Sequence, residues 1–178
     1  MKNKFIFTML FLIILTCNIA GQTTKKKKYP GFSGFYTMAA DKDKDPYDFG
    51  FGFEFLGNIA TKSEYIQNVL GISFTLLHGN KIEGSNDWYS YSIEFDDSEI
   101  ISFFTGFHFG EIEGPYFLPT IAANIIDNDL RIGLNLGIGL TYDNLNIGSK
   151  LRLINMFMQE EPEKDLTFFE VTLGLMFY

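Results

Sequence analysis

The sequence is poor in the residues that build disulfides, metal centres and many catalytic sites. It has one cysteine, Cys17, and two histidines among 178 residues. A single cysteine cannot form an internal disulfide, and the chain lacks the paired Cys and His spacing of a zinc site. It also has no glycine-rich phosphate-binding motif. The sequence therefore predicts no cofactor and no metal ion, and no thiol chemistry once an N-terminal segment holding Cys17 is removed.

Positive charge is also scarce. Lysine and arginine number 14 against 22 acidic residues, which gives a formal charge of −8. Removal of Lys2 and Lys4 with an N-terminal signal leaves 12 basic residues and a charge of −10. Nucleic-acid binding needs a basic surface, so we expect no nucleic-acid partner. With 17% aromatic and only 20% charged residues, the composition is unusual for a protein of the aqueous phase.

No apolar run is long enough for a transmembrane helix, which needs about 20 residues. The N-terminal run covers only residues 5–15, follows two lysines and precedes small residues. This arrangement predicts a secretory signal peptide over residues 1–21, followed by a polar periplasmic lead-in at residues 22–31. The letters "ILTC" ending at Cys17 leave lipidation of that cysteine as an alternative, although Thr16 departs from the usual lipoprotein pattern.

What the chain does have is apolar residues at every second position. The clearest example is "LRIGLNLGIGLTY" at residues 130–142, and "FGFGFEF" and "LGISFTL" repeat the scheme. A period of two predicts β-strands. The other face of these strands carries mainly Gly, Ser, Asn and Thr. Glycine inside a strand weakens it, so this composition does not suit a face exposed to water. Small side chains suit the crowded interior of a narrow barrel, whose apolar face then points into lipid.

The number of strands follows from parity. Bacterial single-chain barrels have even counts, yet nine segments alternate, near residues 32–40, 49–57, 66–77, 88–95, 100–110, 115–125, 130–142, 145–157 and 166–178. The segment "WYSYSIEF" is short and lies between polar stretches, so we place it in a long external loop over residues 78–99. The prediction is an all-β, closed, antiparallel, up-and-down transmembrane β-barrel over residues 32–178, with eight strands, or ten as the fallback. Both termini then lie in the periplasm. Pro115 and Pro119 predict a bulge or a position near a loop in their strand.

The closing stretch "LGIGLTYDNLNIGSKLRL...FFEVTLGLMFY" resembles the last hairpin of small outer-membrane β-barrels of the OmpX and OmpA transmembrane-domain type. The resemblance covers the mature chain as a general pattern. It implies location in the cell outer membrane, contact with outer-membrane lipid and lipopolysaccharide, and a last strand that the outer-membrane assembly machinery recognises. The positions that match this C-terminal assembly signal are Phe169, Val171, Leu173, Leu175, Phe177 and Tyr178.

The same parity selects the charged residues of the barrel interior. An eight-stranded barrel is filled by side chains, so charges inside it must be paired. Two acids and three bases face inward, which favours a structural network, with a gated pore as the alternative. The five residues are Glu54, Arg131, Lys150, Arg152 and Glu170.

The sequence does not predict an enzyme. Lipid A deacylases share this scaffold, but they need a His and a Ser two residues apart on a late strand, and neither His78 nor His108 has that neighbour. The spacing of Asp41, Asp43 and Asp45 resembles a calcium loop, but Pro46 stands where such loops need glycine. A solvated acidic loop is therefore the favoured interpretation, with weak divalent-cation binding left open.

The external loops remain as the candidate functional surface. Trp88, Tyr89 and Tyr91 in the long loop offer aromatic area for an external partner, and a self-packed loop is the alternative. The sequence thus favours a small integral outer-membrane barrel with a structural, adhesion or docking role through acidic surface loops. The alternative is a secreted or periplasmic soluble β-protein that binds a lipophilic ligand.

Overall fold

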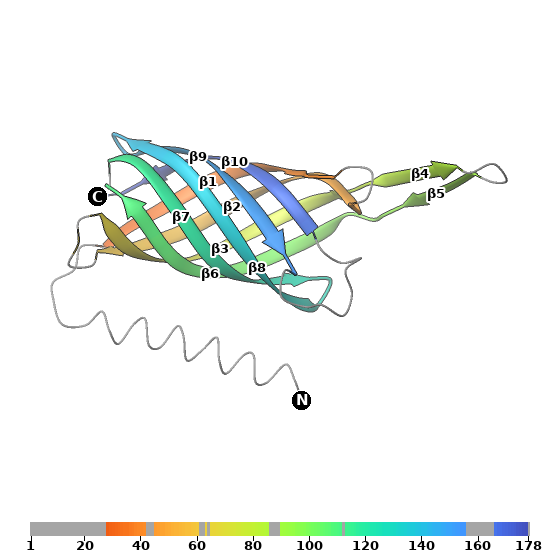
Figure 1. Ribbon diagram of the computed structural model, residues 1–178, viewed down its shortest axis with the longest axis horizontal. Coiled ribbons are helices and arrows are strands. Elements are labelled where there is room, and N and C mark those ends of the chain that lie inside the picture. Colours follow the sequence, from red (N-terminus) through yellow and green to blue (C-terminus); the bar gives the residue numbers. More distant parts are fainter. Residues whose placement is uncertain are drawn as a thin grey trace, which may run out of the picture.

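The computed structural model describes residues 28–41, 45–60, 63, 65–85, 90–111, 113–155 and 166–177. Within these ranges, eight strands close into an antiparallel barrel and two more form a hairpin that projects from one end (Figure 1). The strands are β1 (Lys28–Ala39), β2 (Tyr47–Ala60), β3 (Ile66–Gly79), β4 (Lys81–Ser85), β5 (Ser90–Glu94), β6 (Ser98–Gly110), β7 (Gly114–Ile126), β8 (Asp129–Tyr142), β9 (Leu145–Ile154) and β10 (Leu166–Met176). The prediction of a closed eight-stranded barrel is confirmed.

The order of strands around the barrel is β1-β10-β9-β8-β7-β6-β3-β2, so the first strand pairs with the last. The β4–β5 hairpin is an insertion between β3 and β6. Apart from this insertion, seven of the eight strand pairings in the barrel join strands that are consecutive along the chain. The hairpin lies at the end of the barrel opposite the C-terminus (Figure 1). The ends of β6 and β7 at Gly110 and Gly114 and the turn at residues 143–144 therefore share one end of the barrel with the C-terminus.

Two-residue turns join β7 to β8 and β8 to β9. Asp127 and Asn128 have φ values of 50° and 68°, and Asp143 and Asn144 have 44° and 67°. Positive φ at both central residues defines the hairpin turn whose twist matches that of the strands. Asp and Asn adopt this conformation more readily than other residues with a side chain, so the repeated "DN" sets the register of three consecutive strands.

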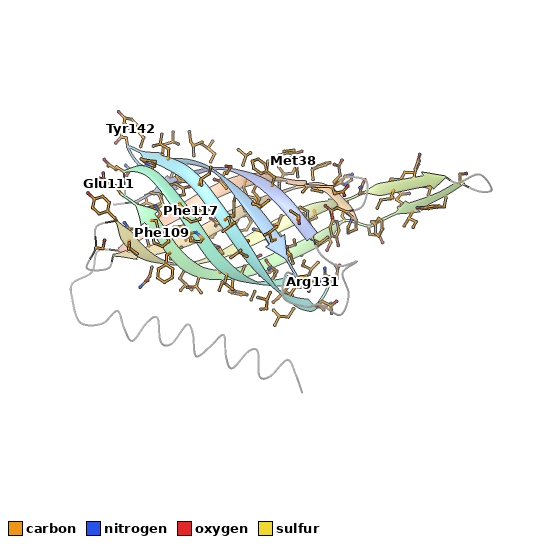
Figure 2. All side chains as sticks on the ribbon, viewed as in Figure 1. Met38, Phe109, Glu111, Phe117, Arg131 and Tyr142 are labelled. Atoms are coloured by element: carbon orange, nitrogen blue, oxygen red, sulfur yellow. The ribbon has the colours of Figure 1, made fainter. Side chains whose placement is uncertain are left out.

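The outer surface of the barrel is apolar. Alternate residues of every barrel strand point outward, as the labelled Phe109, Phe117 and Tyr142 illustrate (Figure 2). The exposed members on the barrel strands include Phe32, Phe51, Phe55, Leu70, Ile72, Phe103, Ile121, Ile138, Leu140, Ile147, Val171 and Leu173. In the part of the chain that the structure describes, no helix is long and apolar enough to span a bilayer.

The inner surface is crowded, and glycines make room for its large side chains. A Cβ atom placed on Gly148 would lie 2.7 Å from the hydroxyl oxygen of Tyr116, which is closer than real atoms approach. One placed on Gly71 would overlap the ring of Phe104. Glycine lowers the β-propensity of these strands, but it leaves room for large side chains inside a narrow barrel. The sequence pattern suggested the same explanation for the glycines.

Two apolar layers lie inside the barrel. The layer near the hairpin end consists of Ala39, Tyr47, Leu77, Ile100, Ile126, Ile154, Leu166 and Phe168. The second layer, further toward the C-terminal end, consists of Val69, Phe104, Leu118 and Ala122, with Leu56 and Tyr116 against it. Phe104 is thus the one phenylalanine of its strand that points inward, whereas Phe103, Phe107 and Phe109 point outward.

Three details differ from the sequence-based expectation. The barrel begins at Lys28, so residues 28–31 belong to β1 and not to the lead-in. β4, the strand that pairs with β5, was not predicted, because its residues are polar or glycine except for Ile82. Pro119 causes no bulge: the β6–β7 register is unchanged on both sides of it, and the ladder only omits the pairs between Gly106 and Phe109. Proline lacks the N–H that would have closed that part of the ladder.

Candidate functional site

Charged side chains gather in the middle of the barrel, between the two apolar layers. Lys150 forms ion pairs with Glu54 and, at 3.5 Å, with Glu170. Arg152 lies 3.0 Å from Glu170 through its Nη2 atom. All four side chains are buried, with exposed fractions of 6% or less. Four of the five predicted interior charges therefore form one cluster, which we call the ion network.

The ion network crosses the lumen. Lys150 and Arg152 lie on β9, and Glu170 is the direct neighbour of Lys150 on β10. Glu54 belongs to β2, two strands beyond β10 around the barrel. Arg152 also donates hydrogen bonds to Thr75 Oγ1 at 3.2 Å and Ser73 Oγ at 3.3 Å. These hydroxyls lie on β3, which is directly opposite β9 in the strand order, so the side chain of Arg152 spans the barrel.

The charges of the ion network balance, since it contains two acids and two bases. Burying an unpaired ion costs several kcal/mol, and this cost is offset only when each charge has close partners. Aromatic rings add to the pairing: Lys150 Nζ lies 5.5 Å from the ring centre of Phe104 and 5.8 Å from that of Phe35. Such contacts are favourable when the cation is shielded from water. The arrangement stabilises a closed, filled lumen.

Glu170 is the least satisfied member of the network. Its contacts with the two bases are ion pairs by distance, but neither carboxylate oxygen has a hydrogen-bond partner among the described residues. Thr37 on β1 lies opposite Glu170 in the strand register, and its hydroxyl also has no hydrogen-bond partner among the described residues. Two neighbouring polar side chains on β1 and β10 therefore lack hydrogen-bond partners among the described residues.

Arg131, the fifth predicted interior charge, is not part of the ion network. It lies at the hairpin end of the barrel, near the turn between β7 and β8 (Figure 2), and is half-buried. In that region Asp127 accepts hydrogen bonds from Ser98 Oγ at 2.7 Å and from the hydroxyl of Tyr47 at 3.4 Å. Arg131 has the inward parity of its strand, but parity carries no information on depth along the barrel.

Tyr47 and Asp127 form a contact across the mouth of the barrel that the sequence did not indicate. Tyr47 opens β2, and Asp127 is in the turn after β7. Their strands lie on different sides of the barrel, with β3 and β6 between them. The buried ring of Tyr47 belongs to the apolar layer at this end. The layer and the hydrogen bond together close the mouth.

The projecting hairpin is the second candidate site. Its strands pair Lys81 with Glu94, Ile82 with Ile93 and Glu83 with Ser92. The prediction that the chain leaves the barrel wall here and forms a β-extension is confirmed, but its bounds of 78–99 were too wide, because residues 78–79 belong to β3 and residues 98–99 to β6. All of β5 is exposed, and both Tyr91 and Ile93 have exposed fractions of 49%. Trp88 and Tyr89, the other predicted contact residues, lie outside the described residues.

The base of the hairpin is tied to the barrel by Asp97. Its Oδ1 atom accepts a hydrogen bond from the amide of Gly79 at 2.9 Å and lies 2.9 Å from Nδ1 of His78. The hydrogen bond from the Gly79 amide holds the pKa of Asp97 below its usual value; desolvation opposes this effect, and the nearby imidazole of His78 adds to it. The ring of His78 packs 4.9 Å from that of Phe49. The contacts of His78 with Asp97 and Phe49 thus hold the base of the hairpin against the barrel.

The acidic loop after β1 is anchored in a similar way. The amide of Asp41 donates to Asp45 Oδ2 at 3.3 Å, and the side chain of Asn80 donates to the carbonyl of Asp45 at 2.9 Å. Burial raises the pKa of Asp45. Asp43, the middle residue of the predicted calcium-like spacing, lies outside the described residues, and the described ones contain no cluster of three metal ligands.

His108, the second histidine of the sequence, is buried in the lumen. Its ring stacks on Tyr116 at 5.0 Å between centroids, and Nδ1 has no hydrogen-bond partner among the described residues. The hydroxyl of Tyr116 donates to Asn146 Oδ1 at 3.1 Å. Asn146 in turn donates to Thr141 Oγ1 at 2.9 Å. These contacts link β6, β7, β8 and β9 near the C-terminal end of the barrel.

The residues of the predicted assembly signal close the barrel. β10 pairs with β9 on one side and with β1 on the other. The outward residues of β10, and Phe177 directly after it, are exposed, with fractions of 43–59%: Phe169, Val171, Leu173, Leu175 and Phe177. Their role as an assembly signal stays a prediction. Tyr178 lies outside the described residues.

The fold is similar to that of a known outer-membrane protein. The backbone structure of the Yersinia pestis outer membrane protein Ail in phospholipid bilayer nanodiscs matches with a TM-score of 0.54 and 11% identity, over 85% of this chain and all of that one. A crystal structure of Ail, the attachment invasion locus protein of Yersinia pestis, in complex with the heparin analogue sucrose octasulfate has a TM-score of 0.48 and 11% identity, over 85% of this chain and 97% of that one. No protein-family model and no curated protein sequence matches.

Proposed function

We propose that the protein is an integral outer-membrane β-barrel without enzymatic activity, and that it acts at the cell surface through its acidic external hairpin and loops. The observation that carries the proposal is the inverted distribution of side chains. The barrel presents phenylalanine, leucine and isoleucine outward and keeps its charges inside. A closed barrel that satisfies its own backbone is one of only two structures that can cross a bilayer.

The hairpin end is the external end in this proposal. Long connections of outer-membrane barrels face the outside and short turns face the periplasm. The described residues at the hairpin end carry Glu83, Glu94, Asp96, Asp97 and Glu99 but few bases, so the surface is acidic. An acidic surface repels the phosphates of lipopolysaccharide unless divalent cations bridge them. The proposed role is docking or adhesion, with the barrel as an anchor.

A soluble protein that binds a lipophilic ligand is the weaker candidate. Such a protein needs an apolar cavity, whereas the lumen here contains an ion network between two packed layers. A conducting pore is disfavoured for the same reason, since ions would have to pass both layers. Among the described residues, His78 pairs with the carboxylate of Asp97 and His108 stacks on Tyr116, and neither contact includes a serine, which supports a role without catalysis.

Membrane fractionation tests the proposal. We expect the protein to remain in the outer-membrane fraction after high-salt and carbonate washes and to change its gel mobility on heating. An epitope tag after Gly84 should be labelled on intact cells, and a tag between Asp143 and Asn144 should not. Release into the carbonate wash would refute the barrel anchor. Labelling only at residues 143–144 would invert the topology.

A further inference from the structure

The hairpin has a free backbone edge along β5. Among the described residues, β5 pairs only with β4, and all five of its residues are exposed. An unpaired strand edge is a template for another strand. We propose that the edge of β5 pairs with the same edge of a second copy of this chain, carried on a facing membrane. The proposal rests on the outer-membrane function proposed above and names its partner.

The hydrogen-bonding pattern shows which residues of β5 are available. The amide of Phe95 donates to the carbonyl of Asn80 at 2.9 Å, so this pair is hydrogen-bonded. Hydrogen-bonded and non-bonded pairs alternate in antiparallel strands. Ile93 and Tyr91 therefore also use their backbone groups toward β4. The N–H and C=O groups of Ser90, Ser92 and Glu94 point to the free edge.

These three residues make the edge complementary to itself. In an antiparallel pair centred on Ser92, each Ser92 lies opposite its counterpart, and Ser90 lies opposite Glu94 of the other copy. All three pairs then use edge-pointing backbone groups. Tyr91 lies opposite Ile93 of the other copy in the close, non-bonded pairs, and aromatic with β-branched pairs are favourable there. The apolar residues Tyr91 and Ile93 of both copies form one continuous face.

Charge also fits this register. Glu94 faces Lys81 within its own hairpin, so the row Lys81, Glu94, Ser90 and Ser85 across the four strands carries one charge of each sign. The second row places the two copies of Glu83 at its outer ends, about 14 Å apart at the usual strand spacing. That distance exceeds the screening length of about 8 Å at physiological salt. No like charges lie opposite each other.

The direction of β5 decides how the two copies are arranged. The hairpin continues along the long axis of the barrel (Figure 1). Two copies in one membrane would point their β5 strands in the same direction and could not pair antiparallel. In copies on two facing membranes the β5 strands run in opposite directions, so the tip of each hairpin lies beside the base of the other. With about 3.3 Å per residue from Ser92 to Asp97 on each side, the two barrel rims lie about 33 Å apart.

Disulfide trapping between cells tests the proposal. Two cell populations, each with short surface polysaccharide, express the full chain with Ser92→Cys and a different epitope tag. After mixing and mild oxidation, we expect disulfide-linked dimers that contain both tags. Ser90→Cys is the matched control, because its counterpart lies four residues away along the pair, and it should give at least tenfold less mixed dimer. Wild-type cells, whose only encoded cysteine is Cys17 in the expected signal peptide, measure the background.

The outcomes separate the two proposals. Dimers with a single tag would place the contact within one membrane and overturn the inference, as would equal trapping by Ser90→Cys. Ser92→Cys copies that are labelled on intact cells but give no mixed dimer would also overturn it, in favour of another occupant such as an extended host peptide, while the proposed function stands. Copies that are not labelled on intact cells would overturn the proposed topology.

A second pair of variants tests the backbone contact directly. Ser92→Pro removes an edge N–H of β5, and Ser85→Pro removes one from the opposite edge, on β4. Proline is tolerated at an edge where the N–H faces solvent. We expect Ser92→Pro to abolish clumping of expressing cells and Ser85→Pro to leave it unchanged. Loss of clumping in both variants, or in neither, would contradict pairing through β5.

Discussion

Replacement of Lys150 by methionine is the most direct test of the ion network. Lys150 is the base that contacts Glu54, and it also lies 3.5 Å from Glu170. Methionine keeps the length of the side chain and removes its charge. The variant would leave two buried carboxylates with Arg152 as the remaining base of the network.

The expected magnitude follows from the burial of these groups. Glu54 has an exposed fraction of 3% and Glu170 of 0%, so water cannot replace the lost partner. Removing one member of a buried ion pair costs about 3–5 kcal/mol, because the remaining charge is left uncompensated. We expect Lys150→Met to lower the free energy of unfolding by that amount. The double variant Glu54→Gln/Lys150→Met keeps one acid and one base, and should recover at least about 2 kcal/mol.

Urea unfolding of the protein in lipid vesicles measures these differences, with the unheated gel mobility of the folded form as the readout. Glu54→Gln alone completes the cycle. A Lys150→Met variant as stable as the wild type would refute the claim that the network is a buried, paired cluster. Additive effects in the double variant would show that Glu54 and Lys150 are not coupled.

Three further outcomes can be checked on the same material. Leu136→Arg, in the middle of β8 on the outer face, should cost about 2–4 kcal/mol in vesicle unfolding, and Tyr142→Arg at the strand end about 0–1 kcal/mol, whereas equal costs would contradict the membrane placement. Gly148→Leu should prevent the heat-modifiable form from appearing, because a phenol ring occupies the space of the new side chain; a fully folded variant would refute the crowding argument. Asp97 has a lowered pKa, so its contribution at the hairpin base is present above about pH 3.9 and is lost as pH falls through the lower pKa of the folded state. The Gly79 amide resonance should therefore shift in that acid range, and the absence of a shift there would contradict the assignment.

The faces of the barrel strands could be predicted from the sequence, because the period of two is a local property. The residues from Leu130 to Tyr142 alternate without exception in the sequence, and from Gly133 to Tyr142 the more exposed residues are those predicted to face lipid. The even strand count followed from a general property of bacterial barrels and not from any one residue. The same reasoning assigned residues 78–99 to an extension.

Contacts across the lumen could not be predicted in the same way. That Arg152 reaches Ser73 and Thr75 depends on the number of strands and on their stagger, which place β9 opposite β3. The depth of Arg131 depends on the same quantities. The start of β1 at Lys28 was missed because its first residues, "KYPG", show no alternation and contain a proline. β4 was missed because a polar two-stranded hairpin has no buried face to impose a pattern.

The position of Glu170 on the last strand has a consequence for how the barrel is completed. Lys150 and Arg152 lie on β9, whereas the carboxylate that they share lies on β10. A barrel without β10 would hold these two cations and only the carboxylate of Glu54 from β2 in its interior. The pairing of β10 with β1 therefore both neutralises the interior and removes the last open edges of the sheet. The closed barrel is thus favoured over an open one by charge as well as by backbone hydrogen bonds.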